Sequence, residues 1–428
     1  ILFTISVNLT HFTLHNIRPK VAPVISPSVY FLPVLVPPVE NIALTPSTQK
    51  PGLFVPVAGL SLFALASGYL MSLIPLSLSY FELSLDLAPW LASIFYLGLL
   101  LGAPCIAPIV ARIGHSKAFI LFLNVLLCSV VVMVLLPQSS VWLAARLVAG
   151  LAVAGIFVVV ESWLLMADTQ KQRAKRLGLY MTALYGGTAI GQLAVDYLGT
   201  TGNLPYLVVI GLLAAASLPA LLVKRGQPQS NEQHSIALSD LKNLSKPAVV
   251  GCLVSGLLLG PIYGLLPVYV SQDMGFAQQT GQFMALIIMG GMIVQPLVSY
   301  LSPRFQKSAL MAAFCLIGAA ALFLLTQKSL VGLWLGFVLL GACAFALYPI
   351  AISLACDHLP SSQIVSATQI MLLSYSVGSV IGPVAASRFN HIEHGLLLYL
   401  AASFVLTFGY LGAHLLLRSK PRLPTAKA

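Results

Sequence analysis

The segment VWLAARLVAGLAVAGIFVVVESWLLM, residues 141–166, is long and apolar enough to cross a lipid bilayer, because about 20 apolar residues span the hydrocarbon at ~1.5 Å rise per residue. It nevertheless carries Arg146 and Glu161. Burying an ionisable side chain in a membrane costs at least roughly 2.5–3.5 kcal/mol, so each group is expected to face a partner or a wet cavity. At about 100° per residue, both fall on one helix face with Gly150 and Phe157. They lie about 22 Å apart along the axis, too far to pair. The segment predicts either a polar pathway through a helical bundle or two buried charges that lock helix packing.

The composition is that of a membrane protein. Apolar residues make up 58% of the 428-residue chain, charged residues only 8%, and the mean hydropathy is +0.95, whereas a soluble domain carries about 25% charged residues. Helices are the expected spanning element because a long apolar run satisfies its backbone hydrogen bonds internally, while a β-barrel would show short alternating segments. The net charge of +11 comes from basic residues in short loops. This pattern favours a bilayer with anionic lipids as the partner and argues against nucleic acid.

Motifs for metal binding, covalent chemistry and nucleotide hydrolysis do not stand out in the sequence. The six cysteines, at positions 105, 128, 252, 315, 343 and 356, form no CxxC, and the eight histidines form no HExxH. We find no nucleophile–base pair, no paired carboxylates and no Walker motif. The sequence therefore predicts no metal, no cofactor, no enzymatic activity and no ATP-driven transport.

Apolar and polar stretches divide the chain into five regions. Residues 1–52 hold many prolines, which prevent a spanning helix, and are predicted to be a disordered N-terminal extension. Two six-helix bundles, 53–223 and 247–417, are separated by a cytoplasmic linker at 224–246 and followed by a basic cytoplasmic tail at 418–428. The predicted fold is an all-α membrane protein with twelve transmembrane helices, at approximately 53–80, 88–110, 118–137, 141–166, 177–199, 203–223, 247–270, 279–301, 308–327, 329–355, 364–387 and 394–417.

The two bundles are predicted to be parallel pseudo-repeats. Matching residues recur at an offset of 191 or 192, namely Pro75 and Pro267, Arg112 and Arg304, Gly150 and Gly341, Gly187 and Gly378, and Gly191 and Gly382. The glycine pairs place small residues on one helix face, which predicts close helix packing. Sixteen Lys and Arg residues in the loops of one side and the C-terminal tail, against two on the other, place both termini in the cytoplasm. A parallel repeat with a site between its halves is typical of secondary transporters.

Several short motifs resemble those of a known transporter family. Arg146 and Gly150 match an Arg-x-x-x-Gly motif in the fourth span. The loop after the second span resembles the signature Gly-x-x-x-Asp-Arg-x-Gly-x-Arg-Lys, since it keeps Arg112, Gly114 and Lys117, although Ala107 and Ala111 replace the usual Gly and Asp. Over residues 53–417 the chain thus resembles the major facilitator superfamily. Its Glu161-Ser162-Trp163, Gly191-Gln192 and Leu347-Tyr348-Pro349 are similar to the YcaD-type branch of bacterial inner-membrane transporters. The resemblance implies alternating access but no particular substrate.

The candidate functional residues fall into three groups. Glu161 and Arg146 are predicted to couple protons or to place charge in the cavity, whereas Asp196, nearer the outer end of its span, is expected to be solvated. Uncharged polar groups suit an organic substrate, and the cavity candidates are Tyr185, Gln192, Tyr263, Tyr348, Gln369 and Tyr375, each of which could instead bond across helices. The predicted cytoplasmic gate comprises Arg112, Lys117, Asp168 and Arg304.

Two function classes fit these features. The first is a monomeric secondary active transporter that moves a small organic molecule across the bacterial inner membrane by alternating access, coupled to protons, with import and efflux both left open by the sequence. The second is a non-transporting membrane sensor or interaction protein built on a transporter fold. No soluble sensory or effector domain stands out in the sequence, which favours the first class. Uptake or efflux by the reconstituted protein distinguishes them.

Overall fold

Twelve helices of 19 to 29 residues form the body of the protein in a computed structural model, which describes residues 54–165, 170–222, 245–327, 329–357, 359 and 361–419. They are α1 (Phe54–Leu76), α2 (Ala88–Ile113), α3 (His115–Leu135), α4 (Ser139–Leu165), α5 (Gln170–Leu198), α6 (Leu204–Leu222), α7 (Lys246–Gly264), α9 (Thr280–Leu301), α10 (Lys307–Thr326), α11 (Leu330–Cys356), α12 (Ser361–Ser387) and α13 (Gly395–Ser419). The predicted N-terminal extension and most of the predicted linker and tail lie outside the described residues.

The length and composition of these helices suit a membrane. Within the described residues, eleven helices are long and apolar enough to cross a bilayer. The twelfth, α5, has 29 residues, but its glycines, Gln192 and Asp196 lower its hydropathy. The described residues outside the helices form turns, bends and short connections. The predicted all-α membrane fold is confirmed.

The two largest differences from the predicted helix boundaries have identifiable reasons. Helix α5 begins at Gln170 rather than at 177, so basic residues predicted to lie in a loop belong to its first turns, and Lys, Arg and Gln are good helix formers. The predicted span 247–270 is interrupted, because α7 ends at Gly264 and is followed by the short α8 (Leu266–Val268) and a π-helical turn at Tyr269–Asp273. Pro267 has no N–H with which to continue the helical hydrogen bonds.

The internal repeat is visible in how glycines pack the helices. An ideal Cβ on Gly150 of α4 would lie 2.1 Å from the Phe95 carbonyl oxygen of α2, and one on Gly341 of α11 would lie 2.0 Å from the Ile287 oxygen of α9. Similarly, Gly191 of α5 packs on α1, and its counterpart Gly382 packs on α7. The contacting residues keep the offsets of 191 and 192. The predicted close packing is therefore confirmed, and it holds each bundle together without side chains at these points.

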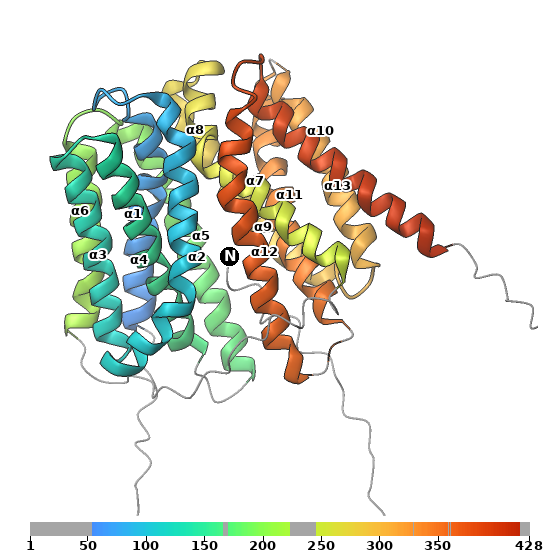
Figure 1. The fold of residues 1–428 in the computed structure, drawn as a ribbon, viewed down its shortest axis with the longest axis horizontal. Helices are drawn as coiled ribbons and strands as arrows, with labels where there is room; N and C mark the ends of the chain where they lie inside the picture. Colours follow the sequence, from blue (N-terminus) through green and yellow to red (C-terminus); the bar gives the residue numbers. More distant parts are fainter. Residues whose placement is uncertain are drawn as a thin grey trace, which may run out of the picture.

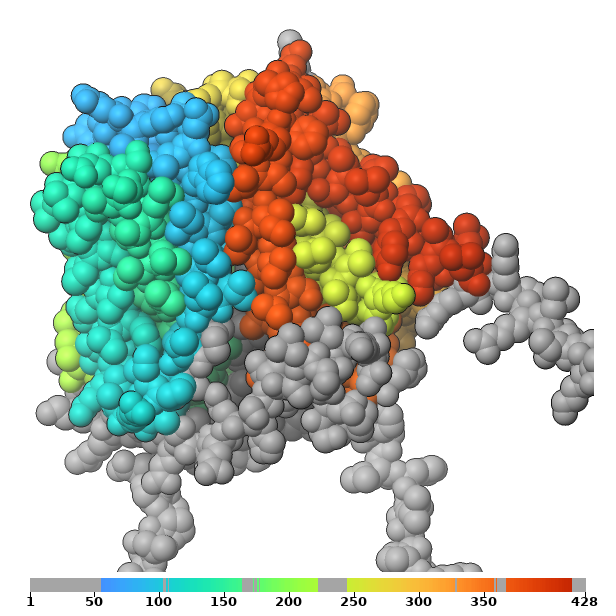
Figure 2. Space-filling view, viewed as in Figure 1, coloured from blue at the N-terminus to red at the C-terminus, as the bar shows by residue number. Residues whose placement is uncertain are grey.

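The helices form two halves that meet along a seam. Helices α1–α6, here the N half, lie beside α7–α13, here the C half (Figure 1). Two helix pairs make most of the contact between the halves, α5 with α9 and α2 with α12. The second pair is visible on the surface as the boundary between blue and orange segments (Figure 2). Near the beginning of α2, an ideal Cβ on Gly264 would lie 2.4 Å from the Ala92 Cβ, so the halves touch closely at this end.

Candidate functional site

A cavity lies on the seam beside this contact. It is lined mainly by the N half, with the C half contributing two residues from α7. The lining residues are Ser67, Leu70, Met71, Ile74, Pro75, Ala88, Leu91, Ala92, Phe95, Tyr96, Leu126, Arg146, Val153, Tyr263 and Gly264. Arg146 is the one charged residue in this lining. A mostly apolar cavity with a few polar groups is the usual form of a small-molecule site.

Arg146 is held in the cavity by helix α2. Its Nε donates a hydrogen bond to the Leu91 carbonyl oxygen at 3.4 Å, and its guanidinium carbon lies 4.2 Å from the centre of the Phe95 ring. The side chain is half-buried. Gly150, one turn further along α4, permits this arrangement because it lets the two helices approach. A guanidinium has five N–H donors, so most of its hydrogen-bonding capacity is left for a bound molecule or water.

Aromatic side chains from both halves continue the site. Tyr263 of α7 packs edge-on against Phe345 of α11, with ring centres 6.0 Å apart, and Phe345 packs on Tyr185 of α5 at 5.7 Å. Deeper in the C half, Tyr348 and Tyr375 pack at 5.1 Å. The buried Tyr348 hydroxyl has no hydrogen-bond partner among the described residues. The structure thus brings the four predicted tyrosines into two aromatic groups, of which Tyr263 borders the cavity itself.

The two predicted glutamines occupy different environments. Gln192 is fully buried between α5 and α1, where its Oε1 accepts a 2.6 Å hydrogen bond from Ser72 and its Nε2 approaches the Met71 sulfur at 3.5 Å. The side chain therefore links two helices of the N half behind the cavity wall. Gln369 is half-buried on α12 and does not line the cavity described above.

Glu161 lies apart from the cavity. It is half-buried near the end of α4, where the Tyr180 hydroxyl of α5 donates a hydrogen bond to its Oε1 at 3.4 Å. Arg146 is fifteen residues away on the same helix, about 22 Å along the axis. The structure therefore separates the two predicted charges, one in the cavity and one toward the end of α4 that is predicted to face the cytoplasm.

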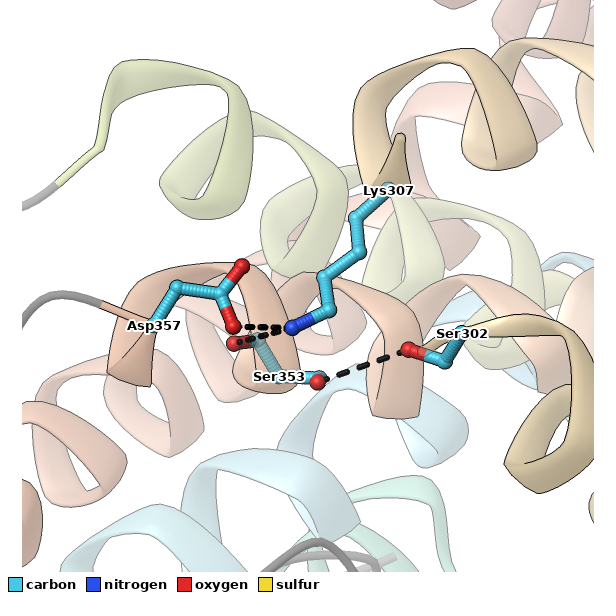
Figure 3. Close-up of polar contacts among 4 residues, drawn as sticks. All are labelled: Ser302, Lys307, Ser353 and Asp357. Carbon is cyan, nitrogen blue, oxygen red and sulfur yellow. Dashed lines mark hydrogen bonds and ion pairs between the residues drawn. The ribbon is translucent and has the colours of Figure 1, made fainter. Parts of the chain in front are cut away.

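The ends of the two halves that are predicted to face the cytoplasm have corresponding contacts with different chemistry. In the N half, His115 Nε2 donates to Ser162 Oγ at 2.9 Å, since the single Ser162 hydroxyl proton is donated to the Val159 oxygen. The C-half counterparts at offsets 192 and 191 are Lys307 and Ser353. Lys307 donates to the Ser353 carbonyl oxygen at 3.3 Å and forms an ion pair with Asp357. Ser302 donates to Ser353 Oγ at 3.4 Å (Figure 3). The repeat thus replaces a neutral contact with a charged one.

The residues predicted to gate the cytoplasmic side are not joined to one another in the described structure. Arg112 and Lys117 are exposed at the ends of α2 and α3. Arg304 lies in the turn after α9 and folds back on that helix, where it donates to the Tyr300 oxygen at 2.6 Å and lies 3.6 Å from the centre of the Tyr300 ring. Asp168 lies outside the described residues. Their role as a gate stays a prediction.

Sequence reasoning missed three aromatic residues and misplaced one acid. Phe95 and Tyr96 line the cavity, and Phe345 bridges Tyr263 and Tyr185. In an apolar span, an aromatic residue that lines a cavity looks the same as one that packs against lipid. The expectation that Asp196 is solvated is wrong, because its carboxylate accepts two hydrogen bonds from the backbone of α9.

A resident metal is not indicated by the described side chains. Among them, no group of three His, Cys, Asp or Glu is placed to hold an ion.

Two repeated bundles of six long apolar helices, with a cavity on the seam between them, define a membrane transporter rather than an enzyme. The model of the Major Facilitator Superfamily matches residues 57–383, and the chain belongs to this family. It is similar to "Uncharacterized MFS-type transporter YcaD" of Salmonella enteritidis PT4, with 31% identity over 390 residues, 89% of this chain and 99% of the relative. The protein of the same name from Salmonella typhimurium LT2 is 30% identical with the same coverage.

Solved structures share the fold at low sequence identity. The nucleoside transporter NupG gives a TM-score of 0.69 at 14% identity, covering 85% of this chain and 98% of NupG. The human organic anion transporter MFSD10 (TETRAN) gives 0.59 at 16% identity, covering 84% and 98%. These likenesses support the twelve-helix arrangement and carry no substrate to this chain.

Proposed function

We propose that the protein is a proton-coupled secondary transporter that moves a small organic molecule across the bacterial inner membrane by alternating access. The observation that carries the proposal is the position of Arg146, a charged side chain in a largely apolar cavity on the seam between the halves. In our proposal the protein acts as a monomer. Both termini and its basic loops face the cytoplasm and the anionic lipids there.

Arg146 and its aromatic neighbours suit a substrate with a flat apolar part and an anionic group. Arginine stays charged at any relevant pH, so it cannot carry the transported proton itself. Its free N–H groups can bind a carboxylate in the planar geometry that lysine lacks. Phe95 and Tyr263 offer ring faces and edges in the same cavity.

Glu161 is the proposed proton carrier. It is a half-buried carboxylate with one long hydrogen bond, from the Tyr180 hydroxyl at 3.4 Å. Among the described residues, no ion pair of Glu161 is found, and low-dielectric surroundings disfavour the charge of a carboxylate in a membrane helix. Its place near the cytoplasmic end suits release of the proton to that side.

Proteoliposomes test the coupling role. Purified protein is screened with a panel of organic anions, and its transport is followed with and without an imposed pH gradient, which also gives the direction. Glu161→Gln mimics the protonated form, so it should still exchange substrate but lose the accumulation driven by the gradient. Glu82→Gln, at an exposed residue, is the matched control. Gradient-driven accumulation that survives in Glu161→Gln would refute the coupling role.

Arg146 variants test the substrate site. Arg146→Lys keeps the charge but loses the planar guanidinium with its paired N–H donors. Substrate affinity should therefore fall by roughly 10-fold, which corresponds to about 1.4 kcal/mol of binding free energy. Arg146→Ala should abolish anion transport. Wild-type transport in both variants would return Arg146 to a packing role. Inactivity of the wild-type protein toward every solute in the assay, despite correct folding, would favour a sensor instead.

A further inference from the structure

The end of α5 away from its basic residues caps a helix of the other half. Asp196 Oδ1 accepts a hydrogen bond from the Gly281 N–H at 2.7 Å, and Oδ2 accepts one from the Gln282 N–H at 2.8 Å. Both donors belong to the first turn of α9. The first N–H groups of a helix have no partner within it, and the helix dipole favours a negative charge there. Each carboxylate oxygen thus makes a charge-assisted bond across the seam.

The backbone at the same point leaves no room for a side chain. An ideal Cβ on Gly281 would lie 2.3 Å from the Gln192 carbonyl oxygen and 3.0 Å from Asp196 Cγ. Gln192 is one turn before Asp196 on α5, and its side chain is fixed to α1 by Ser72. The N half therefore presents both a carboxylate and a carbonyl to the beginning of α9. Only glycine lets α9 come close enough to be capped.

We propose that Asp196 and Gly281 form the outer latch of the transport cycle. Together they hold α5 against α9 while the outer side is closed, and they separate when the cavity opens outward. This inference rests on alternating access as proposed above. Another close contact at this end, Ala92 on Gly264, is apolar. Such contacts lack the directional, charged character of the Asp196 bonds.

The latch is built on one seam of the repeat and not on the other. At the offset of 192, Gly281 corresponds to Pro89 at the beginning of α2, and proline has no N–H to donate. At the offset of 191, Asp196 corresponds to Ser387, whose hydroxyl donates to Val384 of its own helix at 2.9 Å. The symmetry-related seam between α2 and α12 therefore lacks the carboxylate and one of the two donors, since only Trp90, the counterpart of Gln282, keeps its N–H.

Accessibility of the cavity from outside tests the latch without substrate or proton gradient. Ser67 lines the cavity, so Ser67→Cys is introduced into protein whose six native cysteines are replaced by alanine. Right-side-out vesicles are then treated with a membrane-impermeant maleimide. Asp196→Ala and Gly281→Ala should each raise the labelling rate at least tenfold. Asp196→Asn should give a smaller rise, because its amide keeps one acceptor oxygen and turns an N–H toward the second donor.

Matched controls and a second variant keep the test decisive. Gly211→Ala has open space around the added methyl group, and Asp86→Asn changes an exposed acid; both should label at the rate of the parent. If Gly281→Ala does not fold, Asp196→Asn carries the test. Parental labelling rates in folded Asp196→Ala and Asp196→Asn would overturn the latch. Raised labelling in a protein that transports nothing would support the latch and refute the proposed function instead.

Discussion

Replacing Gly150 by alanine should disturb the candidate site through the backbone alone. Gly150 lies one turn from Arg146, and its Cα faces the carbonyl oxygen of Phe95, the residue whose ring holds the Arg146 guanidinium. A methyl group here adds no charge and removes no hydrogen bond. Any effect on transport must come from moving α4 away from α2.

The size of that movement follows from the contact distance. The added Cβ would lie 2.1 Å from the Phe95 oxygen, whereas ordinary contact begins at 3.4 Å, so the helices must separate by about 1.3 Å or deform by that amount. Overpacking of this kind costs about 1–3 kcal/mol of stability. A displacement of roughly 1 Å in a binding site can cost about 100-fold in activity, so we expect kcat/KM for transport to fall by about 10- to 100-fold.

Paired measurements of thermal stability and transport check this reasoning. Gly341→Ala makes the equivalent clash in the C half, 2.0 Å from the Ile287 oxygen, but not beside Arg146. Gly341→Ala should lower the Tm by about as much as Gly150→Ala does, but it should reduce transport by a smaller factor. Gly178→Ala, with nothing within 4 Å of the added methyl group, should change neither. A Gly150→Ala protein with parental Tm and parental transport would show that the close approach of α2 and α4 is not needed.

Three further changes probe other contacts. Lys307→Met leaves Asp357 without its ion-pair partner and should lower the free energy of unfolding by about 1 kcal/mol. In thermal melts, the double variant with Asp357→Asn should recover part of this loss. An unchanged Tm in Lys307→Met would show that the ion pair does not stabilise the fold. Gln192→Leu leaves the buried Ser72 hydroxyl unpaired, so it should lower the free energy of unfolding by about 1–3 kcal/mol with little change in KM. A large rise in KM at the parental Tm would instead indicate that Gln192 contacts the substrate. Arg112→Ala should increase cysteine labelling of the cavity from the cytoplasmic side, because the predicted gate loses a cation, and equal labelling would remove Arg112 from the gate.

Much of the fold could be predicted because a membrane constrains sequence strongly. Apolar runs fix the spanning helices, and the repeat offsets align Gly150 with Gly341 and Pro75 with Pro267. The start of α5 was harder to predict, since the basic residues after 170 are compatible both with a loop and with the end of a helix. The break after Gly264 depends on Pro267, yet Pro75 lies inside α1 near its end without a comparable interruption. The same residue therefore has different effects in the two copies.

The candidate site was only partly predictable. Arg146 stood out because charge is rare in a span, and the structure places it in the cavity. The tyrosines were identifiable as polar groups, but their pairing through Phe345 depends on how two halves meet. Asp196 was misplaced because its partners are backbone N–H groups. Any sequence that forms a helix supplies such donors, so no residue type marks them.

The proline at the beginning of α2 has a mechanical consequence. Because the seam between α2 and α12 lacks the donor that Gly281 supplies to the other seam, the two edges of the closed entrance differ in strength. The weaker edge should part first, while the edge between α5 and α9 stays joined until the Asp196 hydrogen bonds break. The first opening would then lie on one side of the molecule, between α2 and α12. Solutes would meet Phe95 and Tyr96 of that helix before they reach Arg146 behind it.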